Sequence, residues 1–242
     1  MLSFLVVFAA WFFQAFTGFG AGIFIVGILS LFYNPKEVVV SSSVVNLLGN
    51  LLVFVFLKGR ASPDFRILFH LGVGSFLGIA ISSKILMLVS KDALRALIGI
   101  FILVLGFYDF LVQKGWLKLK LKRSFLNGVF AGFLGGLAAG LVGMGGPPPV
   151  VYLNQVCKDV ESFKLTLALY FTFNVLTRAF FYFLYGDISL WNKELITSSV
   201  LATPFGIFLG LKASQYVKPH ILKQFISLSV FFLGLFLLIT AL

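Results

Sequence analysis

A charged side chain, with an amide side chain one helical turn before it, lies inside an apolar segment of this chain. Arg178 follows Asn174 by four residues, and the surrounding stretch 164–185 is predominantly hydrophobic. Residues four apart lie on one face of a helix, so both side chains are expected to point the same way. An arginine at that depth marks a functional site by default, and snorkelling to the nearer interface is the alternative. A guanidinium paired with an amide suits an oxyanion.

A second pair of amides has the same spacing. Asn46 and Asn50 follow three consecutive serines in the segment 37–57. One intramembrane asparagine is often a hydrogen-bonding link between helices, whereas two on one face favour a place in the binding site. Gln14 and Thr17 are weaker candidates.

Two glycine-rich stretches interrupt the apolar regions. The stronger one reads Gly-Met-Gly-Gly-Pro-Pro-Pro over residues 143–149, and a fainter one reads Thr-Gly-Phe-Gly-Ala-Gly over residues 17–22. Glycine and proline end helices, and in hydrocarbon the freed backbone groups need partners from protein, water or solute. Glycine amides and a following helix start form a concavity suited to an anion; a kink filled by neighbouring side chains is the alternative. The candidate binding residues here are Gly18, Gly20, Gly143, Gly145, Gly146 and Pro147.

Composition fixes the class of protein. Of the 242 residues, 60% are hydrophobic and only 11% are charged, and the mean hydropathy is +1.07. These values indicate a helical protein with several membrane spans. The net charge of +11 comes from lysines and arginines between apolar segments, which argues for membrane topology and against nucleic-acid binding.

Several function classes find no support in the sequence. Cys157 is the single cysteine, so neither an intrachain disulfide nor a cysteine metal cage can form. We find no metal-ligand spacing, catalytic triad or phosphate-binding loop, so we expect no enzymatic activity, metal or cofactor. Acidic residues are scarce within the spans, which argues against a carboxylate-lined cation pathway. His70 could titrate, but a lone histidine is more often a packing residue.

The apolar stretches define eight segments with related halves. They cover residues 2–16 with 22–33, 37–57, 66–89, 93–113, 124–142 with 149–157, 164–185, 195–213 and 220–241. The glycines of the two breaks correspond, Asn50 and Asn174 follow them at matching distances, and Gly74 and Gly78 correspond to Gly206 and Gly210. We therefore predict a first repeat at 1–113, a basic linker at 114–123 and a second repeat at 124–242.

Basic residues between the segments test the topology. With eight simple spans, each side of the membrane would receive nine of the eighteen loop lysines and arginines. If the fifth segment instead returns to its own side, thirteen share one face: Lys58, Arg60, Arg66, Lys114, Lys118, Lys120, Lys122, Arg123, Lys158, Lys164, Lys212, Lys218 and Lys223. Five remain opposite: Lys36, Lys84, Lys91, Arg95 and Lys193. This asymmetry favours a re-entrant fifth segment with the basic face in the cytoplasm.

The predicted fold is an all-α polytopic membrane protein with two inverted repeats. Each repeat contains a broken, re-entrant helical hairpin and three transmembrane helices, and an odd number of spans turns the second copy upside down. Gly128, Gly132, Gly136 and Gly140 form a smooth ridge in the fifth segment. The ridge predicts close helix packing, with sliding of the hairpin as the alternative.

Together these features resemble the sulfite exporter TauE/SafE family. The motif at residues 143–148, followed by Tyr152 and Leu153, looks like the family's second-half motif, and residues 14–20 look like its first-half motif. The resemblance implies a secondary transporter of the cell membrane that exports a small sulfur-containing anion, sulfite or an organosulfonate, coupled to a proton or cation gradient. An anion channel and a carboxylate transporter are the alternatives. The oligomeric state, including a homo-oligomer, stays open.

Overall fold

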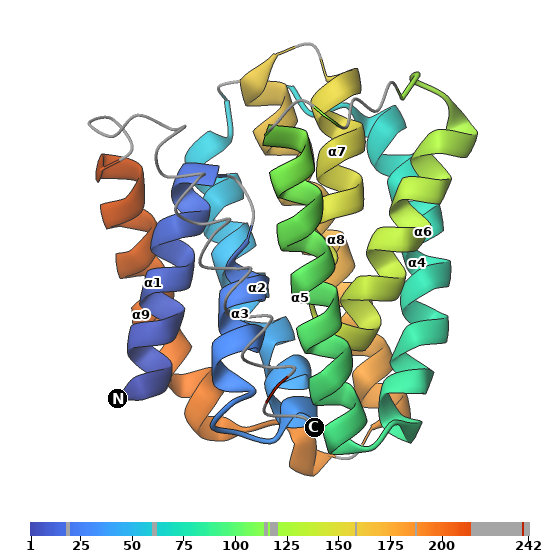
Figure 1. Ribbon diagram of the computed structural model, residues 1–242. Coiled ribbons are helices and arrows are strands. Elements are labelled where there is room, and N and C mark those ends of the chain that lie inside the picture. Colours follow the sequence, from blue (N-terminus) through green and yellow to red (C-terminus); the bar gives the residue numbers. More distant parts are fainter. Residues whose placement is uncertain are drawn as a thin grey trace.

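The structure is a computed structural model, and it describes residues 1–17, 20–59, 62–113, 121–157, 159–186 and 188–213, together with residues 116 and 239. In these ranges the chain is almost entirely helical (Figure 1). The helices are α1 (Leu2–Thr17), α2 (Ala21–Leu29), α3 (Pro35–Leu57), α4 (Phe65–Leu88), α5 (Lys91–Gln113), α6 (Phe125–Val142), α7 (Pro147–Val156), α8 (Val160–Tyr185), the short η1 (Ile188–Leu190) and α9 (Lys193–Ala213). The predicted last segment and most of the basic linker lie outside the described residues.

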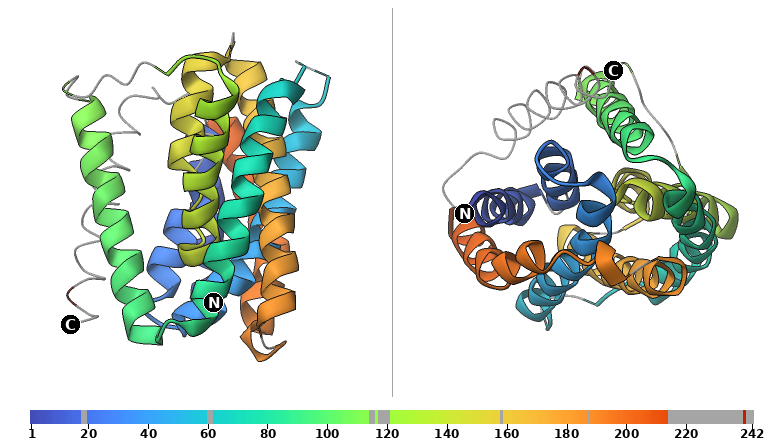
Figure 2. Two further views of the ribbon diagram at one scale, coloured as in Figure 1. Left: turned by 90° about the vertical axis from the view of Figure 1, so that its right-hand side faces the viewer. Right: turned by 90° about the horizontal axis from the view of Figure 1, so that it is seen from below.

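Among the described helices, five are long and apolar enough to cross a membrane: α3, α4, α6, α8 and α9. Large apolar side chains cover the outside of the bundle, among them Phe69, Phe180 and Phe183, each more than half exposed. Such a surface suits lipid rather than water. Figure 2 shows the helices roughly side by side, with α5 at the periphery. The prediction of an all-α polytopic membrane protein is therefore confirmed.

Polar residues fix where the spanning helices begin. The side chain just before each helix accepts a hydrogen bond from a backbone amide of its first turn. This cap satisfies a donor that would otherwise be left free at the helix start. The capping residues are Asn34 for α3, Asp64 for α4, Ser124 for α6, Asp159 for α8 and Asn192 for α9. The spanning helices thus begin close to the connections that the sequence predicted.

The fifth segment is a hairpin. Its first arm, α6, descends from the upper end of the bundle, and its second arm, α7, climbs back (Figure 1). The backbone amide of Leu121, just before α6, donates to Oε1 of Gln155 near the end of α7 at 2.6 Å. A Cβ on Gly135 of α6 would lie 2.7 Å from Cγ of Pro149, so glycine lets the two arms pack closely. The predicted break and hairpin are thus present, and the re-entrant course of this segment in the membrane stays a prediction.

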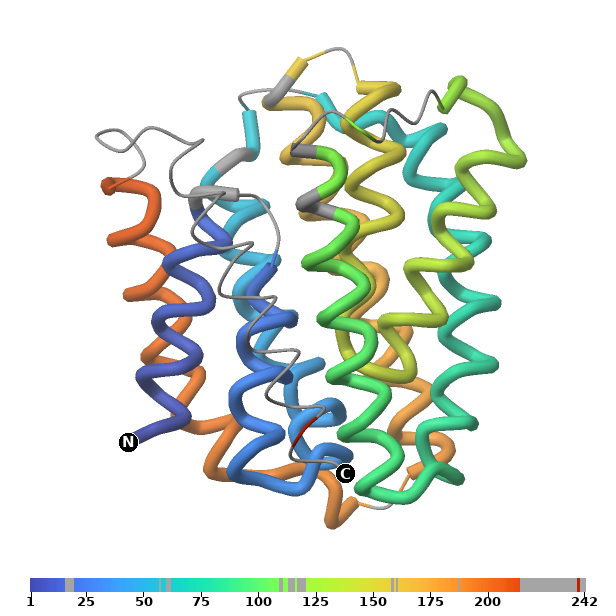
Figure 3. Tube along the Cα trace, viewed as in Figure 1, coloured from blue at the N-terminus to red at the C-terminus, as the bar shows by residue number. Residues whose placement is uncertain are grey.

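The first segment is broken in a similar way. Helix α1 rises from the N-terminus and α2 returns toward the same end, so this hairpin opens opposite to the α6–α7 hairpin, as the tube in Figure 3 shows. Opposite orientation is what the predicted inverted repeat requires. The repeat itself stays a prediction, because the eighth segment lies outside the described residues.

The glycine ridge of α6 packs against α4. A Cβ on Gly132 would lie 2.1 Å from the Leu71 carbonyl oxygen, and one on Gly136 would lie 2.4 Å from the Ser75 carbonyl oxygen. At these distances only a hydrogen fits, so the ridge brings two backbones together. The packing interpretation of the ridge is therefore correct.

The matched glycines of the two halves make matched contacts. On α4, a Cβ on Gly78 would lie 2.4 Å from the Phe133 carbonyl oxygen of α6. On α9, a Cβ on Gly210 would lie 2.5 Å from the Phe12 carbonyl oxygen of α1. Each glycine therefore holds a span of one predicted repeat against the first arm of the other repeat's hairpin.

Candidate functional site

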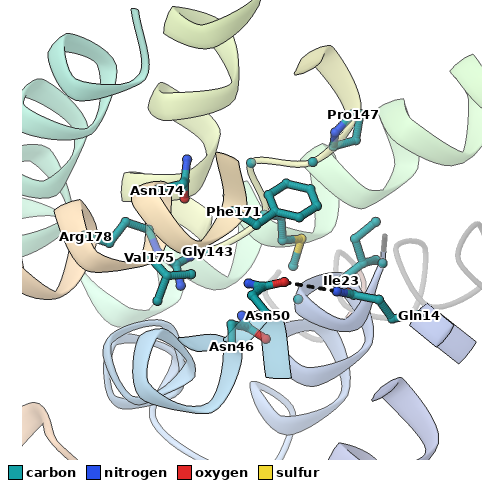
Figure 4. Close-up of a pocket in the computed structure, with 15 residues that line it drawn as sticks. Gln14, Ile23, Asn46, Asn50, Gly143, Pro147, Phe171, Asn174, Val175 and Arg178 are labelled. Carbon is teal, nitrogen blue, oxygen red and sulfur yellow. Dashed lines mark hydrogen bonds between the residues drawn. The ribbon is translucent and has the colours of Figure 1, made fainter. Parts of the chain in front are cut away.

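The two helix breaks meet at one cavity inside the bundle. Its volume is about 50 Å³, and its lining residues come from α1, α2, α3, α7, α8 and the connections at the breaks (Figure 4). Nine of the ten predicted site residues line it: Gly20, Asn46, Asn50, Gly143, Gly145, Gly146, Pro147, Asn174 and Arg178. Gly18 lies outside the described residues. The fold therefore brings these nine residues, which are far apart in the sequence, around one cavity.

The two breaks contact each other beside the cavity. A Cβ on Gly22 would lie 3.0 Å from the Gly143 carbonyl oxygen, so the two hairpins touch at these glycines. Gly143 has a φ of +73°, in the left-handed region that glycine enters without strain. A side chain at Gly143 would also press on Val26 Cγ2 at 3.0 Å. Gly143 therefore needs glycine, and a side chain at Gly22 would fit only if the Gly143 carbonyl moved by a few tenths of an ångström.

The second break offers fewer backbone donors than the sequence suggested. The amide of Gly143 donates to the Ala139 carbonyl at 2.9 Å, and that of Met144 to the Ala138 carbonyl at 3.4 Å. Helix α7 then begins with three prolines, which carry no amide hydrogen. The expectation that this helix start presents amides is thus wrong for its first three residues. The amides of Gly145 and Gly146 are the ones in this loop left for a ligand.

The first break is ordered by Gln14. Its Oε1 accepts the amide of Ala21, the first residue of α2, at 2.8 Å. Because the oxygen is used in this way, Nε2 is the group that faces Asn50, and it donates to Asn50 Oδ1 at 3.5 Å (Figure 4). Asn50 therefore keeps its own amide nitrogen as a donor for the cavity. The sequence ranked Gln14 as a weaker candidate, and the structure gives it a central place.

Arg178 is a buried cation. Its side chain is 1% exposed, and Nη1 donates to the Ala139 carbonyl at 3.3 Å. The guanidinium carbon lies 6.0 Å from the centre of the Tyr182 ring. Burial at this level excludes the snorkelling alternative.

The charge of Arg178 lacks a counter-ion in the part of the chain that the structure describes. Nε and Nη2 are buried without a hydrogen-bond partner there. The ion pairs among the described residues, Arg95 with Asp92 and Arg123 with Asp64, lie near helix ends. Arg178 is also the single charged residue among those that line the cavity. The cavity is therefore electropositive.

A buried network that the sequence did not predict orients Asn174. Its Nδ2 donates to Ser75 Oγ at 3.0 Å, and the Tyr170 hydroxyl lies 3.4 Å from the same oxygen. Tyr170 is one helical turn before Asn174, a spacing that could have drawn attention to it. Ser75 belongs to another helix, α4, and no local pattern links it to α8.

Apolar side chains form part of the cavity wall. Ile23, Met144, Phe171 and Val175 line it beside the polar groups. Phe171 and Val175 share the helix face of Asn174 and Arg178, so their spacing in the sequence is a usable signal for this part of the wall. His70 lies elsewhere: its ring meets Phe125 edge-on, with 5.0 Å between the ring centres, as expected of a packing residue.

Comparisons with known proteins give one match. A family model described as sulfite exporter TauE/SafE matches residues 3–237. No curated protein and no solved structure matches the chain. Among the described residues, no group of three or more histidine, cysteine or acidic side chains could hold a metal ion.

Proposed function

The chain belongs to the sulfite exporter TauE/SafE family, and on this premise we propose that it exports a small sulfur-containing anion, sulfite or an organosulfonate. The proposed binding site is the cavity between the two helix breaks. Arg178 would supply the charge, and Asn50 together with the amides of Gly145 and Gly146 would supply hydrogen bonds. Asn46, Asn174, Gly20, Gly143 and Pro147 would shape the remaining wall.

The observation that carries the proposal is the buried, uncompensated guanidinium of Arg178. Taking an ion out of water costs several kcal/mol unless an opposite charge and hydrogen bonds offset it. Within the described residues Arg178 receives one carbonyl contact and no carboxylate. An anion in the adjoining cavity would provide the missing charge, and a guanidinium binds oxyanions through its planar set of donors.

Broken hairpins suit alternating access. In transporters with inverted repeats, solutes bind near the midplane at discontinuous helices, and one part of the protein rocks against the other. The supporting feature here is the contact between Gly22 and Gly143, where the two hairpins meet beside Arg178. We propose that rocking at this contact opens the cavity to one side of the membrane at a time.

The proposed orientation follows from charge. Among the described residues, Lys58, Arg66, Lys122, Arg123, Lys164 and Lys212 lie at or beside the helix ends at which α3 and α9 finish and α4, α6 and α8 begin. Basic loops remain in the cytoplasm, so we propose this end as the cytoplasmic one in the cell membrane. Export would then run from this end to the other, driven by a proton or cation gradient.

Counterflow in proteoliposomes tests the function. Purified protein is reconstituted with unlabelled sulfite inside, and entry of labelled sulfite is followed in vesicles with wild-type protein, Arg178→Gln or Arg66→Gln. Arg66 is exposed and outside the cavity, so its variant controls for loss of a positive charge. We expect saturable counterflow for the wild type and for Arg66→Gln, and at least tenfold slower counterflow for Arg178→Gln.

The alternatives give different results in the same vesicles. An anion channel would show electrical current without counterflow. A carboxylate transporter would show counterflow of acetate or a similar carboxylate in place of sulfite. Unchanged counterflow in Arg178→Gln would refute the assignment of the site.

A further inference from the structure

We infer that the cavity selects anions of a single negative charge over dianions of the same shape. The inference rests on the proposed function and concerns the charge of its substrate. It follows from a balance of the full and partial charges that surround the cavity.

The full charges around the cavity amount to one. Arg178 is the single charged side chain among the lining residues, and within the described chain its nitrogens meet no carboxylate. A monoanion would leave the pair neutral, whereas a dianion would leave one negative charge uncompensated. At this depth in the protein an uncompensated charge is strongly disfavoured.

Partial charges of the broken helices do not change this balance. A helix end carries roughly half an elementary charge, positive at the N-terminus and negative at the C-terminus. The first break joins the C-terminus of α1 to the N-terminus of α2. The second break joins the C-terminus of α6 to the N-terminus of α7. Each break therefore contributes one positive and one negative partial charge, and these two charges cancel. Arg178 itself donates to Ala139 in the last turns of α6, which draws its charge toward the negative end.

Directional donors do not favour a dianion either. Three prolines remove the first amides of α7, and Gln14 already occupies the amide of Ala21 at the start of α2. The donors left for a ligand besides Arg178 are Asn50 and the amides of Gly145 and Gly146, and a further part of the wall is apolar, with Ile23, Met144, Phe171 and Val175. A tetrahedral anion with one uncharged, weakly solvated corner fits this wall better than one that carries charge on every corner.

An isosteric series separates charge from shape. Dimethyl sulfone, methanesulfonate and sulfate each place four heavy atoms around one sulfur and carry charges of zero, minus one and minus two. Each is titrated against purified full-length protein in detergent, and the concentration that gives half of the maximal rise in unfolding temperature is measured. We expect methanesulfonate to act at a concentration at least tenfold lower than either of the other two.

Variants make the test specific to the cavity. Arg178→Gln should lose the advantage of methanesulfonate over dimethyl sulfone, whereas Arg66→Gln should keep it. Sulfate that binds as tightly as methanesulfonate would overturn the selection of monoanions and leave the anion site standing. Dimethyl sulfone that binds as tightly as methanesulfonate, or no binding by any of the three, would overturn the anion site as well.

Discussion

At the scale of single residues, the site depends on which end of each amide faces the cavity. Gln14 connects the first amide of α2 to Asn50, and these two bonds leave the Asn50 nitrogen as a donor. Asn174, by contrast, donates a hydrogen bond from its Nδ2 to Ser75 Oγ. Two asparagines that look equivalent in the sequence therefore present different atoms. Asn50 suits an anion directly, and Asn174 contributes mainly to the order of the wall.

Gln14 is expected to act through Asn50. Replacing Gln14 with methionine removes the bond that orients Asn50. A hydrogen bond to a charged ligand is worth about 1.5–3 kcal/mol, so the KM for transport should rise by about tenfold or more. Asn50→Ala should raise KM by a similar factor. The double variant should be no worse than Asn50→Ala alone, because the two changes remove one interaction. Additive effects on KM in the vesicle assay would contradict a positioning role for Gln14.

Cys157 reports on the connection after α7. Burial, together with Asp64 and Asp159, raises the pKa of its thiol to about 11 from an ordinary 9.0, and Arg123 opposes this only in part. At pH 7.5 the thiolate fraction is then roughly one-hundredth of that of an ordinary thiol. Maleimide labelling of the native protein should be correspondingly slow and should accelerate about tenfold for each unit of pH. Rapid labelling at pH 7.5 would show that this connection is open to solvent.

At the scale of helices, glycines decide how close the hairpins come to the spans. The contacts of α6 with α4 and of α1 with α9 both bring backbone against backbone. In lipid, the hydrophobic effect does not drive helices together, because the lipid tails are as apolar as the side chains. Association of the helices therefore depends on such close packing. Each hairpin is thus carried by a span of the other predicted repeat.

Two neighbouring glycines of α4 provide a matched test. A Cβ on Gly74 would lie 1.9 Å from the Val129 carbonyl oxygen, whereas one on Gly72 would lie 3.5 Å from the nearest atom, in the Phe173 ring. Gly74→Ala should lower the free energy of unfolding by about 1–3 kcal/mol through overpacking. Gly72→Ala should leave it unchanged or raise it by up to about 1 kcal/mol. Thermal unfolding of the purified variants measures both, and equal effects would contradict the packing of α4 on α6.

At the scale of the whole molecule, the hairpins set the sidedness of every later loop. The start of α6 and the end of α7 lie at the same end of the bundle. Helix α8 therefore starts at the end where α6 started. A spanning fifth segment would move Lys164 to the other side and remove the charge asymmetry.

Single cysteines test this sidedness. In a Cys157→Ser background, cysteines are placed at Arg66, Lys122, Lys91 or Lys193, all of which are exposed. An impermeant maleimide added to intact cells should label the positions of Lys91 and Lys193, and should label those of Arg66 and Lys122 only in inverted vesicles. Labelling of Lys122 and Lys193 from one side would contradict the proposed orientation.

Much of this arrangement was predictable from the sequence, because bilayer and backbone chemistry act locally. Glycine and proline mark the breaks, and the spacing of Asn174 and Arg178 places them on one face. Ser75 was not predictable, because its contact with Asn174 depends on how α4 packs against α8. The loss of amides at α7 was missed for another reason: the apolar pattern placed the helix from residue 149, whereas it begins at Pro147.

The three prolines have one more consequence. At the start of α7 they keep the positive end of the helix but remove every hydrogen that could bind a ligand in a fixed direction. Pro147 lines the cavity, so a solute that passes it breaks no hydrogen bond with its backbone nitrogen. At Pro147 the α7 side of the cavity therefore offers no directional bond, and in the proposed site the groups that fix a solute in place are Arg178, Asn50 and the amides of Gly145 and Gly146.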